Sequence, residues 1–214
     1  MAAPEFRLFE RNLPDVETEE AAELVDTYFG LGGELRALDG ERDLNFHVDG
    51  EDGSFVFKIA NAEDGEDVVG FQVAALQHIR ERDPSLPVPV MQQGSNGQIM
   101  QRVTTRSGSS HILRLVSFLP GTPVDSAPAT QRTWREIGKL LGRLNVALGS
   151  FYHPAAQAND HPWDTANCLR FQPLTRHIAD PSARELVNSV FDRFRDVVKP
   201  RLDGTRHQII HQDA

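Results

Sequence analysis

Two short turns, each with an Asp-Gly step, strongly restrict how the first part of this chain can fold. The segment GELRAL (residues 33–38) leads into LNFHV (residues 44–48) across the turn at residues 39–42. LNFHV in turn leads into SFVFKIA (residues 54–60) across residues 49–53. An Asp-Gly step between β-type segments is typical of hairpin turns, because glycine tolerates the positive φ that such turns require. The sequence therefore predicts a three-stranded antiparallel meander.

Helices and further strands are predicted on both sides of this meander. Asp15 can cap a helix that has its apolar residues on one face and ends near Gly30. A second helix is predicted from about Glu66 to Arg82, and the prolines that follow end it. Two strand-like segments come next, GQIMQRV and HILRLVSFL.

The segment PGTPVDSAPAT is rich in Pro, Gly and Ser and is predicted to separate two parts of the chain. Residues 1–119 form the β-rich part. Residues 120–214 have the apolar spacing of helices, followed by a short strand at residues 208–210. A sheet followed by helices gives the α+β fold class, and ligand sites tend to lie where such parts meet.

Charge and cysteine content exclude several classes of protein. The 214 residues include 22 Lys and Arg against 31 Asp and Glu, which gives a net charge of −9. Without a basic face, neither a nucleic acid nor a membrane surface is expected as a partner. Cys168 is the single cysteine, so neither an internal disulfide nor a thiolate metal cluster is predicted. The N-terminal residues lack the apolar segment of a signal peptide, and no segment approaches membrane-spanning length, so a cytoplasmic protein is expected.

Lys58 lies in the third predicted strand, where alternation places it on the face opposite the phenylalanines. Two interpretations stay open. The residue can be an edge-strand lysine with its ammonium group in water, or a lysine that pairs with the phosphates of a nucleotide. In the second interpretation Gln72 on the following helix is the best-placed partner, with Glu66 or Asp67 as acidic substitutes. Gln72 can equally be an ordinary helix residue.

The first hairpin offers a second candidate for phosphate contacts. Gly40, Asp43 and Asn45 lie in or beside this turn, whose backbone N–H groups can contact phosphate oxygens. An ordinary turn is the other interpretation. The chain contains neither G-x-G-x-x-G nor G-x-x-x-x-G-K-[ST], so neither a Rossmann site nor a P-loop is predicted.

Ser117, Phe118 and Leu119 form the connection between the last predicted strand of the β-rich part and the Pro-rich segment. Backbone N–H and C=O groups exposed in such a hinge can pair with the edge of a purine. Taken alone, the segment is only a connection between two parts of the chain.

Motifs for metal and nucleophile chemistry are not found in the sequence. None of the eight histidines forms H-E-x-x-H, and His207 and His211 are four apart in strand-like sequence, which does not place them on one helical face. No G-x-S-x-G is present. We therefore predict no metal ligands within the chain and no hydrolase of the nucleophile-elbow type.

Three features occur in order: Lys58 in a third strand, the hinge VSFLPGTPV, and the segment IIHQDA. Together they closely resemble the aminoglycoside phosphotransferase-like family of small-molecule kinases. The stretches RDLNFHV, FVFKIAN and WREIGKLLGRLNVALGSF are most similar to its hydroxylysine kinase-like branch. The resemblance implies a protein-kinase-like fold of two lobes, an antiparallel β-sheet lobe and an incomplete helical lobe.

The resemblance also implies roles for individual residues. His211-Gln212-Asp213 matches the start of the family's H-x-D-x-x-x-x-N motif, so Asp213 is expected to be the catalytic Asp that orients the acceptor hydroxyl. The acceptor is expected to be a small amino-containing metabolite such as hydroxylysine or an aminoglycoside-like molecule. Mg²⁺ is expected to be held by ligands beyond Ala214. The residues expected to bind ATP or GTP are Lys58, Gln72, Asp43, Asn45, Ser117, Phe118 and Leu119.

Because the expected metal ligands fall outside these 214 residues, we expect this chain alone not to catalyse phosphoryl transfer. Apolar surface on its last helices is expected to be uncovered, which favours self-association. Two alternatives stay open. One is a non-catalytic module that binds a nucleotide or a metabolite, and the other is a plain fragment of a longer kinase–aminotransferase polypeptide.

Overall fold

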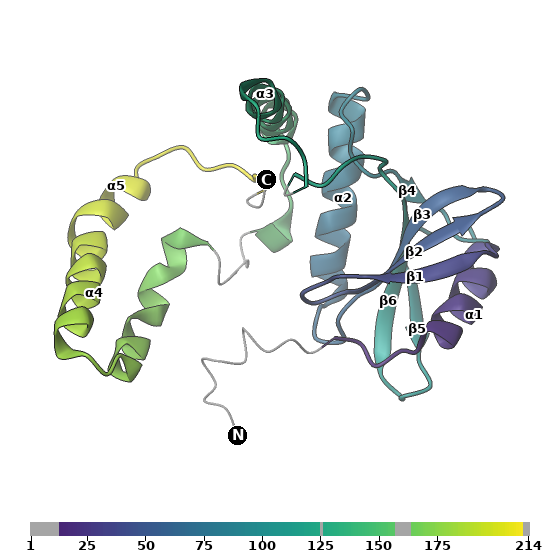
Figure 1. The fold of residues 1–214 in the computed structure, drawn as a ribbon, viewed down its shortest axis with the longest axis horizontal. Helices are drawn as coiled ribbons and strands as arrows, with labels where there is room; N and C mark the ends of the chain where they lie inside the picture. The colour runs from purple at the N-terminus through teal and green to yellow at the C-terminus, as the bar shows by residue number, and fades with distance from the viewer. Residues whose placement is uncertain (1–12, 125, 157–163, 212–214) are drawn as a thin grey trace.

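The structure of the chain is a computed structural model, and it describes residues 13–124, 126–156 and 164–211. One antiparallel sheet occupies the first half of the chain, and helices make up most of the second half (Figure 1). This arrangement confirms the predicted α+β class.

The sheet combines the predicted meander with three later strands. β6 pairs with β3, and its outer edge is shared by β4 and β5, so the order is β1-β2-β3-β6-β4 with β5 also on β6. The sequence pattern does not predict the two-residue strand β4, because the strand is very short and follows a segment with prolines at positions 87 and 89. In chain order the strands are β1 (Glu34–Leu38), β2 (Leu44–Gly50), β3 (Gly53–Ile59), β4 (Met91–Gln92), β5 (Gln101–Thr104) and β6 (Ser110–Ser117).

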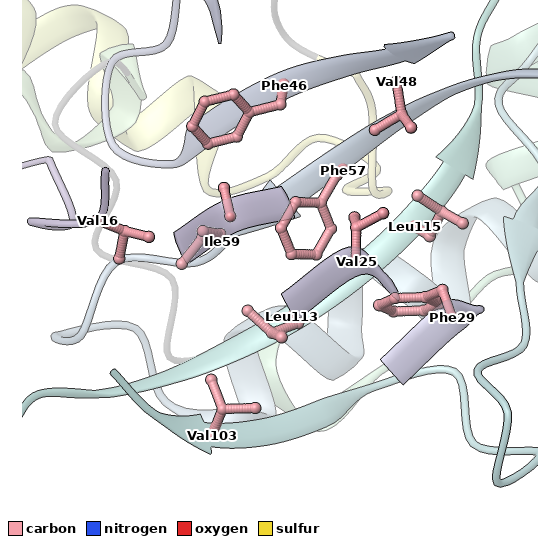
Figure 2. Close-up of a cluster of buried hydrophobic side chains, with 11 residues drawn as sticks. Val16, Val25, Phe29, Phe46, Val48, Phe57, Ile59, Val103, Leu113 and Leu115 are labelled. Carbon is pink, nitrogen blue, oxygen red and sulfur yellow. The ribbon is translucent and has the colours of Figure 1, made fainter. Parts of the chain in front are cut away.

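Helix α1 (Thr18–Phe29) covers one face of the sheet. Its apolar residues, among them the fully buried Val25, pack onto the sheet to form the main core (Figure 2). The helix ends at Gly30, whose φ of 66° is the left-handed conformation that favours glycine. The predicted cap at Asp15 is wrong, because the N-cap is Glu17, whose side chain makes no capping hydrogen bond. The strand residues of this core are Phe46, Val48, Phe57, Ile59, Val103, Leu113 and Leu115.

Helix α2 (Glu66–Arg82) lies along the other face of the sheet, and its limits are those predicted. Near its start Val69 is buried against Ile112 of β6. The first turn is acidic and the last turn is basic, which suits the helix dipole at both ends.

Helix α3 (Gln131–Leu148) begins directly after the Pro-rich segment. Thr130 caps it, since its side chain accepts a hydrogen bond from the N–H of Thr133 at 3.1 Å. The end of α3 packs against α2 in a second cluster of buried residues. The members of this cluster are Ile79, Leu86, Ala147 and Leu148.

Five further helical segments follow α3 among the described residues, and α4 lies beside η3 (Figure 1). Leu186 and Val190 on α4 are 66% and 62% exposed, so apolar surface on this helix is uncovered in the structure. No helix in the described ranges is long and apolar enough to cross a membrane. These segments are η2 (Pro154–Ala156), η3 (Thr165–His177), α4 (Pro181–Arg193), η4 (Phe194–Val198) and α5 (Lys199–Leu202).

The strand predicted at residues 208–210 is wrong, because this segment has no regular secondary structure. Gln208 donates a side-chain hydrogen bond to the C=O of Asn145 at 3.1 Å, and Ile209 packs against the α2–α3 cluster. A strand requires a neighbour that completes its hydrogen-bond ladder. None of the described strands pairs with this segment.

Candidate functional site

A cavity of about 360 Å³ lies between α2 and the sheet. Its volume falls in the range of small-molecule sites, and most of its lining is apolar. Two of its lining residues, Lys58 and Arg114, carry charge. The lining residues are Val56, Lys58, Gln72, Val73, Leu76, Pro89, Met91, Arg114, Val116, Ser117, Phe118 and Leu119.

Lys58 reaches this cavity because the alternation of β3 sends its two strand neighbours into the α1 core. β3 lies inside the sheet, so the interpretation of Lys58 as an edge-strand lysine is wrong. The antiparallel register places Asn45 of β2 and Arg114 of β6 on either side of Lys58. The Lys58 Nζ donates a hydrogen bond to Asn45 Oδ1 at 2.5 Å and lies 3.5 Å from Asp43 Oδ2.

Asp43 joins the two cations of the cavity. Its Oδ2 atom accepts a hydrogen bond from the guanidinium of Arg114 at 2.6 Å, in addition to the ion pair with Lys58. The Arg114 side chain is only 5% exposed, and a charge this deeply buried requires a partner. Burial lowers the pKa of Lys58 below its ordinary value of 10.5; Asp43 acts against this shift, and Arg114 adds to it.

Gln72, the predicted partner of Lys58, lines the same cavity from α2. The described partners of Lys58, however, are Asn45 and Asp43. Glu66, considered as an acidic substitute on α2, instead forms an ion pair with Arg102 at 2.9 Å. The carboxylate beside Lys58 therefore comes from the start of β2.

Asp43 and Asn45 were expected beside phosphates through the first hairpin. In the structure neither belongs to the cavity lining; both contact the charged residues that do. Asn45 thus holds Lys58, and Asp43 holds both Lys58 and Arg114, beside the cavity.

The segment after β6 forms another wall of the cavity. The backbone N–H of Ser117 donates to Val90 O, and that of Phe118 donates to Ser54 O, both at 2.9 Å. The N–H of Leu119 makes no hydrogen bond to another described residue. Of the three hinge residues, Leu119 is thus the one whose backbone N–H has no hydrogen-bond partner among the described residues.

Two residues of the site are missed by the sequence analysis. Arg114 is a charged residue in the middle of the apolar segment HILRLVSFL, and this placement alone indicates a buried, paired charge. His47 lies against the hinge, with its ring centroid 4.3 Å from that of Phe118 and its Nε2 2.6 Å from Ser54 Oγ. The sequence LNFHV alone carries no pattern that predicts these contacts of His47.

Asp213, the predicted catalytic residue, lies outside the described residues. Across residues 13–124, 126–156 and 164–211, no group of three or more His, Cys, Asp or Glu side chains could hold a metal ion.

The sequence of residues 34–214 matches the phosphotransferase enzyme family. The chain is 27% identical over 218 residues to the hydroxylysine kinase of Bos taurus, covering 94% of this chain and 57% of that protein. It is 24% identical over 209 residues to the hydroxylysine kinase of Mus musculus, covering 91% of this chain and 56% of that protein. The chain thus spans a little over half the length of these relatives.

Two solved structures share the fold. A structure of an amicoumacin kinase in complex with AMP-PNP, Ca²⁺ and Ami has a TM-score of 0.62 at 13% identity, covering 92% of this chain and 56% of that one. A structure of spectinomycin phosphotransferase, APH(9)-Ia, in complex with ADP and spectinomycin has a TM-score of 0.55 at 11% identity, covering 89% of this chain and 57% of that one. These likenesses confirm the predicted kinase-like fold. With its sequence matched from residue 34 to residue 214, the chain belongs to the phosphotransferase enzyme family.

Proposed function

We propose that this chain carries the nucleotide-binding part of an ATP- or GTP-dependent phosphotransferase. The proposed acceptor is a hydroxyl of a small amino-containing metabolite, such as hydroxylysine or an aminoglycoside-like molecule. The observation that carries the proposal is a cavity with Lys58 and Arg114 in its lining, which Leu119 also lines, and the Leu119 amide makes no hydrogen bond to another described residue. A nucleoside triphosphate has the matching parts, an anionic phosphate chain and a purine edge.

Lys58 contacts the phosphates in this proposal. Its ammonium group faces the cavity, and charge-assisted hydrogen bonds to phosphate oxygens are stronger than neutral ones. Phosphoryl transfer depends mainly on positioning and on charge stabilisation. A well-placed lysine therefore contributes without any covalent step.

The purine binds at the hinge. The Leu119 N–H donates to a ring acceptor, and the apolar side chains of Val56 and Val116 contact the faces of the base. Gln72 contributes a polar group from the α2 side of the cavity. Adenine and guanine both fit this description, so ATP and GTP are both proposed.

Asp213 acts as the catalytic Asp that orients the acceptor hydroxyl. The hydroxylysine kinase relatives supply the reason for an amino-containing acceptor. Residues 1–119 then bind the nucleotide, and residues 120–214 contribute to the acceptor side. Mg²⁺ neutralises phosphate charge when it is bound, but the described residues contain no ready cluster of ligands for it.

A second candidate function is a module that binds a nucleotide or metabolite without turnover. The observation that favours binding is the cavity, whose lining includes the two cations Lys58 and Arg114. We accordingly propose that these residues bind the nucleotide but do not complete phosphoryl transfer by themselves. A plain fragment without any binding is the remaining alternative.

A coupled assay for nucleoside diphosphate tests these proposals. The 214-residue protein is incubated with Mg²⁺ and ATP or GTP, with hydroxylysine or an aminoglycoside as acceptor, and nucleotide binding is measured in parallel. We expect binding without turnover. Acceptor-dependent turnover that is lost in Asp213→Asn would show that these residues catalyse by themselves, and absence of binding would contradict both the kinase part and the binding module.

Two further features belong to the proposal. A cytoplasmic location is proposed because nucleoside triphosphates are available there and the chain has a single cysteine, as expected in a reducing compartment.

Self-association is proposed because Val146, Leu186 and Val190 are each more than half exposed on the helices that follow the hinge.

A further inference from the structure

The acid beside Lys58 comes from the segment that leads into β2, and not from helix α2. Among the described residues Lys58 has one carboxylate partner, Asp43, and this residue precedes β2. We propose that Asp43 and Arg114 together position Lys58 for phosphate, so that the sheet, and not helix α2, sets the direction of this lysine. The inference rests on the proposed phosphate contact of Lys58.

The geometry of the pair supports this role. One carboxylate oxygen, Asp43 Oδ2, lies 2.6 Å from the Arg114 guanidinium and 3.5 Å from the Lys58 Nζ. Asn45 holds the same ammonium group from the neighbouring position on β2, at 2.5 Å. Asp43 and Asn45, which lie on the β2 side of β3, therefore direct the Lys58 side chain. Arg114 on β6 in turn holds Asp43.

Burial makes this support rigid. The Arg114 side chain is 5% exposed and that of Asp43 is 15% exposed, so neither can exchange its partner for water easily. Arg114 lies on β6, opposite Lys58 in a continuous antiparallel register. A carboxylate bonded to Arg114 is therefore held by a strand of the sheet and not by α2.

The charges that face Lys58 come from two elements. Asp43, before β2, is the acid, and Arg114 on β6 is the second cation. Helix α2 faces the cavity with the uncharged Gln72, Val73 and Leu76, and Asn45 on β2 is also uncharged. Removal of the acid and removal of the second cation must therefore have opposite effects on the pKa of Lys58.

The test is the titration of the Lys58 ammonium group in the nucleotide-free protein, followed by NMR. We expect Asp43→Asn to lower the pKa of Lys58 further and Arg114→Gln to raise it. Asp64→Asn is the matched control, because Asp64 is also 15% exposed and also pairs with an arginine, Arg42, at 2.7 Å. This control should leave the titration of Lys58 unchanged.

The affinity for ATP is measured over the same pH range. Above the pKa of Lys58, each unit by which that pKa falls reduces the charged fraction, and the ATP affinity that depends on it, about tenfold. ATP affinity should therefore decline at a lower pH in Asp43→Asn than in the wild type, and at a higher pH in Arg114→Gln. Adenosine, which has no phosphate, should bind with the same pH profile in all variants.

Shifts of opposite sign support the inference, because a general loss of structure would move both variants in the same direction. Coincident Lys58 titrations, or shifts of the same sign, overturn it. If Asp43→Asn does not fold, Arg114→Gln alone decides through the direction of its shift. If the wild type binds no ATP, the proposed function fails; if it binds ATP with the same pH profile as the variants, only this inference fails.

Discussion

Lys58 combines a partly buried ammonium group with an inner-strand position, and its side chain is 26% exposed. Burial disfavours the charged form, while Asp43 favours it. In the proposed contact, a phosphate in the cavity binds the Lys58 ammonium group. The phosphate is then a second anion beside Lys58, in addition to the Asp43 carboxylate. At the residue scale, the site is thus a balance of two cations against one carboxylate.

This balance makes the stability of the protein depend on pH. The pKa of Lys58 is lower in the folded chain than its ordinary value of 10.5, so the unfolded chain holds more protons in the pH range just below 10.5. The contribution of Lys58 to the free energy of unfolding therefore rises with pH in that range. We expect the difference in unfolding free energy between the wild type and Lys58→Met to grow in favour of the wild type as pH increases. Urea unfolding at several alkaline pH values measures it, and parallel pH curves for the two proteins would contradict the assignment.

The hinge supplies a prediction that concerns one backbone group. Leu119→Pro removes the N–H proposed to donate to the purine, whereas Leu119→Ala keeps it. A single neutral hydrogen bond contributes about 0.5–1.5 kcal/mol, so Leu119→Pro should bind adenosine roughly 2- to 12-fold more weakly than Leu119→Ala. Calorimetric titration with adenosine measures this difference, and melting curves of both variants control for folding. Equal affinities would exclude the Leu119 amide as a base contact.

Single residues differ in how far the sequence predicts their roles. Alternation along one strand is enough to place Lys58 on the cavity face, because it needs no knowledge of other strands. The contact between Asp43 and Arg114 joins residues 71 positions apart, so it depends on the register of three strands. The sequence pattern within one segment does not determine such contacts.

At the scale of elements, local chemistry explains which predictions hold. The hairpins and the limits of α2 follow from turn residues and helix periodicity within short segments. β4 and the strand wrongly predicted at residues 208–210 depend on what lies beside them in space. The first finds a neighbour in β6 although prolines precede it, and the second finds no partner strand among the described residues.

The β1–β2 turn gives a prediction for an element that supports the site. A Cβ atom at Gly40 would clash with the C=O of Asp43 and would lie 2.6 Å from Asn45 Nδ2. Gly40→Ala should therefore destabilise the protein by about 1–3 kcal/mol, as overpacking commonly does, and should disturb both residues that direct Lys58. Gly32→Ala is the control, because a Cβ there meets no atom within 4 Å. Chemical denaturation compares the two; equal stabilities would show that the turn relaxes freely.

The whole molecule joins a sheet with a well-packed core to helices whose apolar residues are partly exposed. Val146 is 82% exposed, and Leu186 and Val190 are 66% and 62% exposed. Replacement of all three by serine should lower self-association without loss of folding, because none of them is part of a buried cluster. Sedimentation velocity over a range of concentrations measures this change. A wild-type protein that stays monomeric at all concentrations would contradict the proposed self-association.

The central claim is that the cavity between α2 and the sheet binds a nucleoside triphosphate through Lys58. Calorimetric titration of the wild type and of Lys58→Met with ATP and with adenosine tests it most directly. Hydrogen bonds to charged groups contribute about 1.5–3 kcal/mol, so Lys58→Met should weaken ATP binding by roughly 10- to 150-fold and leave adenosine binding unchanged. Absence of ATP binding by the wild type, or equal ATP affinity in both proteins, would contradict the claim.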